Sequence, residues 1–183
     1  MKWTCDCLNR FGPNSDRDAF FTTRSPNAVP LGAMRAVVQR VTGAQVEIEG
    51  KVVGKCGHGL CLLVAVHRED DESRARKLAE KIVNLRIFSD DEGKMNLSLL
   101  DLSSRGTAVG ILAISNFTVY GDCSKSRRPS FTASAPFEAG KSLFDGFLVA
   151  LSASGIPVET GEFGADMQVS LVNDGPVTLV VEC

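Results

Sequence analysis

The segment 115–118, with the sequence Ser-Asn-Phe-Thr, lies near the end of the longest strand candidate in the chain, residues 107–120. It places three hydrogen-bonding side chains just before Gly121-Asp122, a turn signal. Polar side chains at a strand end can hold a substrate or a water molecule. They can equally satisfy the polar groups of the strand end itself, and the pattern leaves both interpretations open.

A second unusual segment is 173–178, with the sequence Asn-Asp-Gly-Pro-Val-Thr. Its proline removes a backbone donor between two strand candidates, 167–172 and 177–181, and therefore requires a turn, a bulge or a sheet edge. A Gly-Pro bond adopts the cis form at a cost of only about 0.5–1 kcal/mol. A cis bond would aim the adjacent carbonyls in directions that a regular strand does not allow. A simple hairpin turn is the alternative.

The usual catalytic side chains do not occur at motif spacings. His58 lies between two glycines and His67 follows an apolar run; neither has an acid at a triad spacing, and we expect both at surface turns. The chain has no GxSxG, P-loop or HExxH motif. The six cysteines form no CxxC pair, which argues against a metal site and for a reducing compartment: Cys5, Cys7, Cys56, Cys61, Cys123 and Cys183.

Composition places the chain among globular proteins of one domain. It has 183 residues, of which 44% are hydrophobic and 23% are charged. No stretch approaches 18 consecutive apolar residues, so we expect no membrane span. The net charge of −2 argues against a broad basic face that grips duplex DNA.

Residues 1–33 differ from the rest of the chain. They have no period of 2 or 3.6, they are interrupted by prolines, and their net charge is +1, so we predict a disordered extension. They lack the apolar core of a secretory signal, and three aspartates argue against an organelle transit peptide. The globular domain is therefore expected over residues 34–183.

The elements that must position the two unusual segments come in hairpin groups. Residues 37–41 and 45–49 are strand candidates, a turn at 49–51 leads into 52–53, and the continuous apolar run 60–66 predicts a central strand. Two helices are also predicted. This mixture indicates an α+β fold with a mixed, largely antiparallel sheet rather than a doubly wound parallel one.

The first helix begins after Asp70 or Asp71 and has one apolar face, formed by Ala75, Leu78, Ala79, Ile82 and Leu85. Basic residues fill its other side; they indicate a solvated face, with nucleic-acid binding as the alternative. The second helix is predicted to have Ser134 as its cap, Pro136 in its first turn and Gly155 beyond its end.

At these residues the sequence resembles the D-aminoacyl-tRNA deacylase family over essentially all of residues 34–183. Seven stretches in the family's order carry the resemblance: RAVVQRV (35–41), LRIFSD (85–90), GKMN (93–96), SNFTV (115–119), RPSF (128–131), GADM (164–167) and NDGPVT (173–178). The resemblance implies a barrel-like deacylase fold with two main helices and no cofactor. It implies an ester hydrolase that removes a D-amino acid, or glycine mischarged on tRNA(Ala), from the 3′ end of tRNA.

The resemblance also implies a homodimer with its active sites near the interface. The catalytic strand end would be Ser115, Asn116, Phe117 and Thr118. Gly175 and Pro176 would form a chirality gate that enters the partner's site, with Arg40 holding the loop. The adenosine pocket would contain Phe163 and Met167.

The sequence departs from the family at Asn116, where glutamine is usual, so the amide reaches one methylene less far. In the family, the 2′-hydroxyl of the terminal ribose is thought to activate the hydrolytic water. Thr118 ranks second as a nucleophile because no histidine base is evident. Backbone amides near Phe117 and Thr118 could form an oxyanion hole.

Lys125, Arg127 and Arg128 form a basic cluster that could meet the acceptor phosphates of tRNA or could be a solvated loop. The resemblance implies proofreading in translation and a cytoplasmic location. Two alternatives stay open: a related deacylase for tRNA mischarged with an L-amino acid, and a non-catalytic module that binds the tRNA end. The sequence does not reveal the isomer of the Gly175–Pro176 bond.

Overall fold

A computed structural model describes residues 33–124 and 126–183. Its elements follow the order β1 (Arg35–Ile48), β2 (Lys51–Cys56), β3 (Gly59–Ala65), α1 (Glu72–Val83), β4 (Phe88–Ser89), β5 (Met95–Leu97), α2 (Leu99–Ser104), β6 (Gly110–Ser115), the 3₁₀-helix η1 (Phe117–Tyr120), α3 (Phe137–Ser152), β7 (Val158–Thr160) and β8 (Gln168–Glu182). The extension predicted to be disordered lies outside the described residues, apart from the buried Ala33.

The main sheet is mixed, which confirms the predicted α+β fold. Its strand order is β2-β1-β3-β6-β7, and β8 pairs with β1. The long strand β1 is antiparallel to β2, β3 and β8, whereas β3, β6 and β7 run parallel to one another. The first half of β1 pairs with β3 and its second half with β2, so β1 joins the two halves of the sheet.

The sheet curls until its two end strands approach each other. A Cβ atom at Gly54 in β2 would lie 2.6 Å from the carbonyl oxygen of Thr160 in β7, so only glycine allows this close approach. Because the sheet is curled, the buried apolar residues form two separate clusters, one on each face of the sheet. A small one lies inside the sheet and includes Val41, Val46, Cys61 and other buried residues. The larger one lies between the sheet and the helices.

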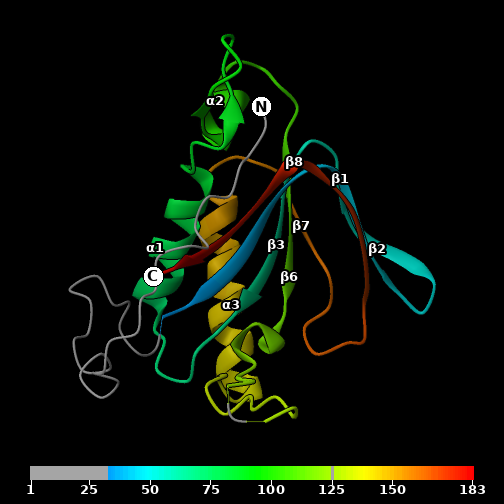
Figure 1. Cartoon of the computed structure of the whole chain (residues 1–183), viewed down its shortest axis with the longest axis vertical. Helices are drawn as coiled ribbons and strands as arrows, with labels where there is room; N and C mark the ends of the chain where they lie inside the picture. Colours follow the sequence, from blue (N-terminus) through cyan, green and yellow to red (C-terminus); the bar gives the residue numbers. More distant parts are fainter. Residues whose placement is uncertain (1–32, 125) are drawn as a thin grey trace, which may run out of the picture.

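Helices α1 and α3 cover one face of the sheet, on the side opposite the β1–β2 hairpin (Figure 1). Asp71 caps α1 as predicted, because its carboxylate accepts a hydrogen bond of 2.9 Å from the Arg74 amide. The prediction that Ser134 caps the second helix is wrong. Pro136 occupies the cap position of α3 without a side-chain bond, and the Ser134 hydroxyl donates to the carbonyl of Phe117.

Several predicted strands have different bounds in the structure; the candidates 37–41 and 45–49, for example, are one strand, β1. The candidate 107–120 ends as a strand at Ser115, and its last residues form η1. The candidates 167–172 and 177–181 are not joined by a hairpin turn but belong to one strand, β8. Within β8, Asn173 pairs with Val41 and Thr178 pairs with Gln39. Between these two pairs lies one residue of β1, Arg40, and four residues of β8, 174–177, so the longer segment bulges out of the ladder.

His67 is not a surface turn residue. It is buried; its Nδ1 atom accepts a hydrogen bond of 3.1 Å from the Glu69 amide, and its ring meets Tyr120 edge to face. Burial raises the pKa of the Tyr120 phenol, which donates to the carbonyl of Ala33. These contacts make His67 part of the packing beneath η1.

No helix in the described part of the chain is long and apolar enough to cross a membrane.

Candidate active site

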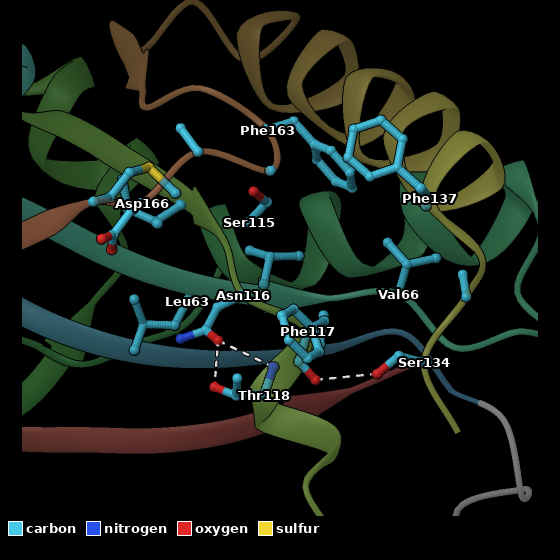
Figure 2. Close-up of a pocket in the computed structure, with 18 of the residues that line it drawn as sticks. Leu63, Val66, Ser115, Asn116, Phe117, Thr118, Ser134, Phe137, Phe163 and Asp166 are labelled. Atoms are coloured by element: carbon cyan, nitrogen blue, oxygen red, sulfur yellow. Dashed lines mark hydrogen bonds between the residues drawn. The ribbon is translucent and has the colours of Figure 1, made fainter. Parts of the chain in front are cut away.

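A pocket of about 670 Å³ opens where the parallel strands β3 and β6 end (Figure 2). Strands that run parallel bring their carboxyl ends to the same edge of a sheet, and ligands commonly bind there in open α/β sheets. The start of α3 and the loop between β7 and β8 complete the walls. The unusual segment 115–118 thus faces the pocket because it is the carboxyl end of β6.

Asn116 forms the turn from β6 into η1. Its amide donates a hydrogen bond of 2.7 Å to the Val64 carbonyl of β3, which anchors the turn to the sheet. Its side-chain Oδ1 atom accepts from the Thr118 amide at 3.1 Å and from the Thr118 hydroxyl at 2.5 Å (Figure 2). Asparagine is a favoured N-cap because its short amide reaches the amide two residues later. The shorter side chain of asparagine, compared with the glutamine usual in the family, therefore suits a cap on η1.

The Thr118 hydroxyl has no general base in this arrangement. It points its proton at an amide oxygen, which does not remove protons at neutral pH. Among the described residues that line the pocket, none is histidine or cysteine, and only Asp166 has an ionisable side chain. A nucleophilic serine or threonine needs an adjacent base. The geometry therefore argues against a covalent intermediate on Thr118.

Thiolate chemistry is disfavoured as well. Burial raises the pKa of Cys56, and burial together with the neighbouring Cys56 raises the pKa of Cys61 to about 12. Both residues belong to the interior of the curled sheet, away from the residues that line the pocket.

Phe117 lies at the lip of the pocket. Its side chain is 59% exposed, and its carbonyl accepts a hydrogen bond of 3.1 Å from the Ser134 hydroxyl. The Thr118 amide is already engaged by Asn116, so it is not free to bind an oxyanion. The Phe117 amide is the first of η1, and the first amides of a helix have no carbonyl partner within it.

The far end of the pocket is apolar and aromatic. The Phe163 ring meets Phe137 edge to face at 5.1 Å between centroids, and Met167 lines the same cavity. A Cβ atom at Gly164 would lie 2.6 Å from the Phe137 ring, so this wall is closely packed. The pocket therefore brings together Phe163, Met167 and all four residues of the segment 115–118.

Arg40, Gly175 and Pro176 do not line this pocket. Arg40 is 8% exposed, and its Nε atom lies 2.9 Å from the carboxylate of Asp174 and 3.3 Å from its carbonyl oxygen. Its Nη1 atom donates to the carbonyl of Ile87. One guanidinium therefore fixes the bulge of β8 to the chain that precedes β4. The Gly175–Pro176 bond is cis.

Two further features hold the bulge in one shape. The Asn173 side-chain amide donates to the Arg40 carbonyl at 3.2 Å and to the Val177 carbonyl at 2.9 Å, which ties the two ends of the bulge together. Gly175 has a φ of +120°, and a Cβ atom there would lie 2.8 Å from a methyl group of Val177. Only glycine fits this position.

Sequence reasoning missed most of the other residues that line the pocket, among them Ser134, Phe137 and Asp166. Asp166 stands inside the GADM stretch, beside a residue that was assigned to the site, so its position was a usable signal. Phe137 follows Pro136 at the start of a helix, and nothing in the local pattern distinguishes it from a packing residue. Of the predicted basic cluster, Arg127 and Arg128 are exposed, and Lys125 lies outside the described residues.

Comparison with known proteins places this chain among the tRNA deacylases. The family model described as D-Tyr-tRNA(Tyr) deacylase matches residues 37–182. A D-aminoacyl-tRNA deacylase of Thermosipho africanus is 55% identical over 149 residues, which are 81% of this chain and 97% of the relative. One from Chloroflexus aurantiacus is 56% identical over 149 residues, which are 81% of this chain and 90% of the relative. The chain belongs to the D-Tyr-tRNA(Tyr) deacylase family.

Solved structures agree with this fold. A structure titled c-Myc DNA Unwinding Element Binding Protein is 35% identical, with a TM-score of 0.74, and the match covers 81% of this chain and 98% of that one. A structure described as a probable eukaryotic D-amino acid tRNA deacylase has a TM-score of 0.70 at 18% identity. That match covers 82% of this chain and all of the other, and it supports the fold alone.

Proposed function

We propose that this chain hydrolyses the ester that joins a D-amino acid to the 3′-terminal adenosine of tRNA, releasing the free amino acid and tRNA. The observation that carries the proposal is the extent of the match. D-Aminoacyl-tRNA deacylases align over 97% and 99% of their own lengths at 55% and 53% identity. The aligned part of this chain includes every element that builds the pocket.

The two ends of the pocket suit the two parts of such a substrate. The apolar end with Phe163 and Met167 accommodates the adenine, and the polar turn at Asn116 and Thr118 accommodates the ester. Water attacks the ester carbonyl carbon, and the bond from that carbon to the ribose 3′ oxygen breaks. The proton of the water passes through the ribose 2′-hydroxyl to the leaving 3′ oxygen. The Phe117 amide binds the oxyanion that forms in between.

This substrate-assisted route is consistent with the side chains that line the pocket. Among the described residues that line the pocket there is no histidine, cysteine or lysine, and Asp166 is the one side chain that could act as a base, so the proposed route gives that role to the ribose hydroxyl instead. The route predicts that a substrate ending in 2′-deoxyadenosine is bound but hydrolysed much more slowly than its ribose counterpart.

The active form in this proposal is a homodimer, in which Gly175 and Pro176 of one protomer enter the pocket of the other and reject L-amino acids. The bulge is held by Arg40 and Asn173, it does not line its own chain's pocket, and it is flanked on β8 by exposed apolar residues. Val172 and Val180 are 63% and 64% exposed, which suits a surface that a second copy covers.

The proposal extends to glycine mischarged on tRNA(Ala), because glycine has no side chain for the gate to reject. It places the protein in the cytoplasm, where aminoacyl-tRNA is used in translation. DNA is not a proposed partner. A net charge of −2 does not provide the basic surface that binding to a duplex backbone requires.

A deacylation assay tests the proposal. The same tRNA is charged with D-tyrosine, L-tyrosine or glycine, and release of the amino acid is followed at equal enzyme concentration. We expect rapid release of D-tyrosine and glycine and none of L-tyrosine above the rate without enzyme. Release of L-tyrosine alone would identify a deacylase for L-mischarged tRNA, and binding without release would identify a non-catalytic module.

A further inference from the structure

An exposed pair of aromatic rings continues the pocket onto the surface. Phe117 lines the pocket, and its ring meets Phe131 edge to face, with 5.1 Å between centroids and 77° between planes. The side chains are 59% and 36% exposed. Phe131 itself does not line the pocket, so the pair extends the aromatic surface beyond the space that holds the proposed adenosine and ester.

The Phe131 ring is held in place although it is uncovered. A Cβ atom at Gly121 would lie 3.0 Å from this ring, so the ring packs directly on the backbone that ends η1. Asp122 and Ser130 exchange two backbone hydrogen bonds of 2.9 Å, which close the loop that carries Phe131 into a hairpin. A ring fixed in this way loses little conformational entropy when a flat ligand stacks on it.

The same hairpin carries exposed positive charge. Arg127 and Arg128 are exposed near its tip, and no ion pair within residues 33–124 and 126–183 involves either of them. Exposed aromatic rings together with exposed guanidinium groups on the same segment of chain are a combination that binds single-stranded nucleic acid, in which bases stack on the rings and phosphates meet the charges.

We propose that Phe117 and Phe131 form a stacking subsite for the base of the nucleotide that immediately precedes the terminal adenosine of tRNA. The inference rests on the proposed function, which puts the terminal adenosine in the pocket. The 3′ end of tRNA is single-stranded, so the preceding base is free to stack outside the duplex. That nucleotide leaves the pocket at its lip, where Phe117 belongs to both surfaces.

Three small substrates separate the parts of this subsite in the full-length protein. The first is D-tyrosyl-adenosine, the second is D-tyrosyl-CpA, and the third carries an abasic ribose phosphate in place of the cytidine. We expect kcat/KM for the CpA ester to exceed that of the other two by at least about five-fold, the lower bound for one base–aromatic stack. An equal rate on the CpA and abasic esters would overturn the subsite, because the phosphate alone would then account for binding.

The variant Phe131→Leu keeps an apolar side chain against Gly121 but cannot stack, whereas Phe131→Tyr keeps the ring. We expect Phe131→Leu to lose the preference for the CpA ester while its kcat/KM on D-tyrosyl-adenosine stays within about two-fold, and Phe131→Tyr to retain both. The matched control is Val149→Ala, which shortens a side chain that is 72% exposed on α3, away from the pocket.

The outcomes distinguish this inference from the proposed function. If the wild-type protein hydrolyses none of the three esters, nor D-tyrosyl-tRNA, the proposed function fails. If it hydrolyses them and Phe131→Leu keeps the full preference for CpA, the stacking subsite is wrong. If Phe131→Leu instead changes the sedimentation coefficient of the protein, the ring pair is a contact between copies of the chain, and the subsite is equally wrong.

Discussion

Asn116 forms the turn between β6 and η1, at the point where the pocket opens. The backbone of Asn116 is bonded to β3 and its side chain caps η1, so the residue fixes both sides of the point where the pocket opens. The amide oxygen that holds the Thr118 hydroxyl is an acceptor without being a base. The side chain of Asn116 therefore positions Thr118 without activating its hydroxyl.

The first prediction concerns the Thr118 hydroxyl. Thr118→Ala removes the 2.5 Å bond to Asn116 but leaves the amide that makes the cap, so we expect kcat/KM on D-tyrosyl-tRNA to fall by less than about ten-fold, the effect of about 1.4 kcal/mol. Rates are compared by single-turnover deacylation. A trapped acyl ester on Thr118, or complete loss of turnover in a folded variant, would show that this residue is the nucleophile.

The second prediction concerns the cap. Asn116→Ala leaves the Thr118 amide without its acceptor, and loss of an N-cap costs about 0.5–2 kcal/mol. In a domain of this size that corresponds to a lower melting temperature by about 1–8 °C. Asn116→Asp is the matched control, since it keeps an oxygen at the same reach. Equal melting temperatures for the two variants would mean that the cap contributes nothing to stability.

Some residue-scale features were predictable and others were not. The sequence marks 115–118 as unusual because polar side chains follow an apolar run, but it does not tell which partner each side chain chooses. Ser134 illustrates the limit. Its position favours a helix cap, yet its hydroxyl donates to Phe117, which lies 17 residues away in the chain and is brought close only by the fold.

At the scale of elements, the bulge in β8 is the feature that carries the proposed chirality gate. Arg40 reaches the bulge from the adjacent strand β1 and binds Asp174 through both its carboxylate and its carbonyl. Because the same guanidinium binds Ile87, the bulge is also tied to the segment that precedes β4.

The third prediction tests that support. Arg40→Ala removes the guanidinium that joins Asp174 to Ile87, so we expect the ratio of turnover on D-tyrosyl-tRNA and L-tyrosyl-tRNA to fall by at least about ten-fold. Arg40→Lys should restore only part of the ratio, since a point charge does not replace a planar fork. Arg35→Ala is the control, because Arg35 also lies on β1 but pairs with Glu182. If the ratio of D- to L-turnover is unchanged in folded Arg40→Ala, discrimination between the enantiomers does not depend on this arginine.

Elements with a strong period were predictable, and the bulged strand was not. The apolar run 60–66 and the capped pattern after Asp71 both correspond to elements of the structure, β3 and α1. By contrast, the local pattern at Gly175 and Pro176 predicts that the strand ends there. β1 is long enough to pair with β8 on both sides of the bulge, and this pairing makes one strand out of two candidates. Such continuity depends on the partner strand and not on the local pattern.

At the scale of the whole molecule, the bulge of β8 does not line the pocket of its own chain. The fourth prediction follows: the protein is a dimer at micromolar concentration, and a charge on the exposed face of β8 disrupts it. The double variant Val172→Asp and Val180→Asp should sediment as a monomer and lose discrimination or turnover. Val149→Asp on α3, at 72% exposure, is the matched control and should stay dimeric.

The dimer prediction has a clear contrary result. A wild-type protein that sediments as a monomer and still hydrolyses D-tyrosyl-tRNA with full discrimination would show that the site is complete within one chain. The gate would then have to be formed by residues that line the pocket itself, and Asp166 would be the first of these to examine.

The most direct test of the central claim is a competition between enantiomers in one reaction. Equal amounts of D-tyrosyl-tRNA and L-tyrosyl-tRNA are mixed with the full-length protein, and the tyrosine released is resolved on a chiral column over time. We expect D-tyrosine to be released to completion while L-tyrosine appears only at the rate measured without enzyme. Release of both enantiomers at comparable enzyme-dependent rates would contradict it.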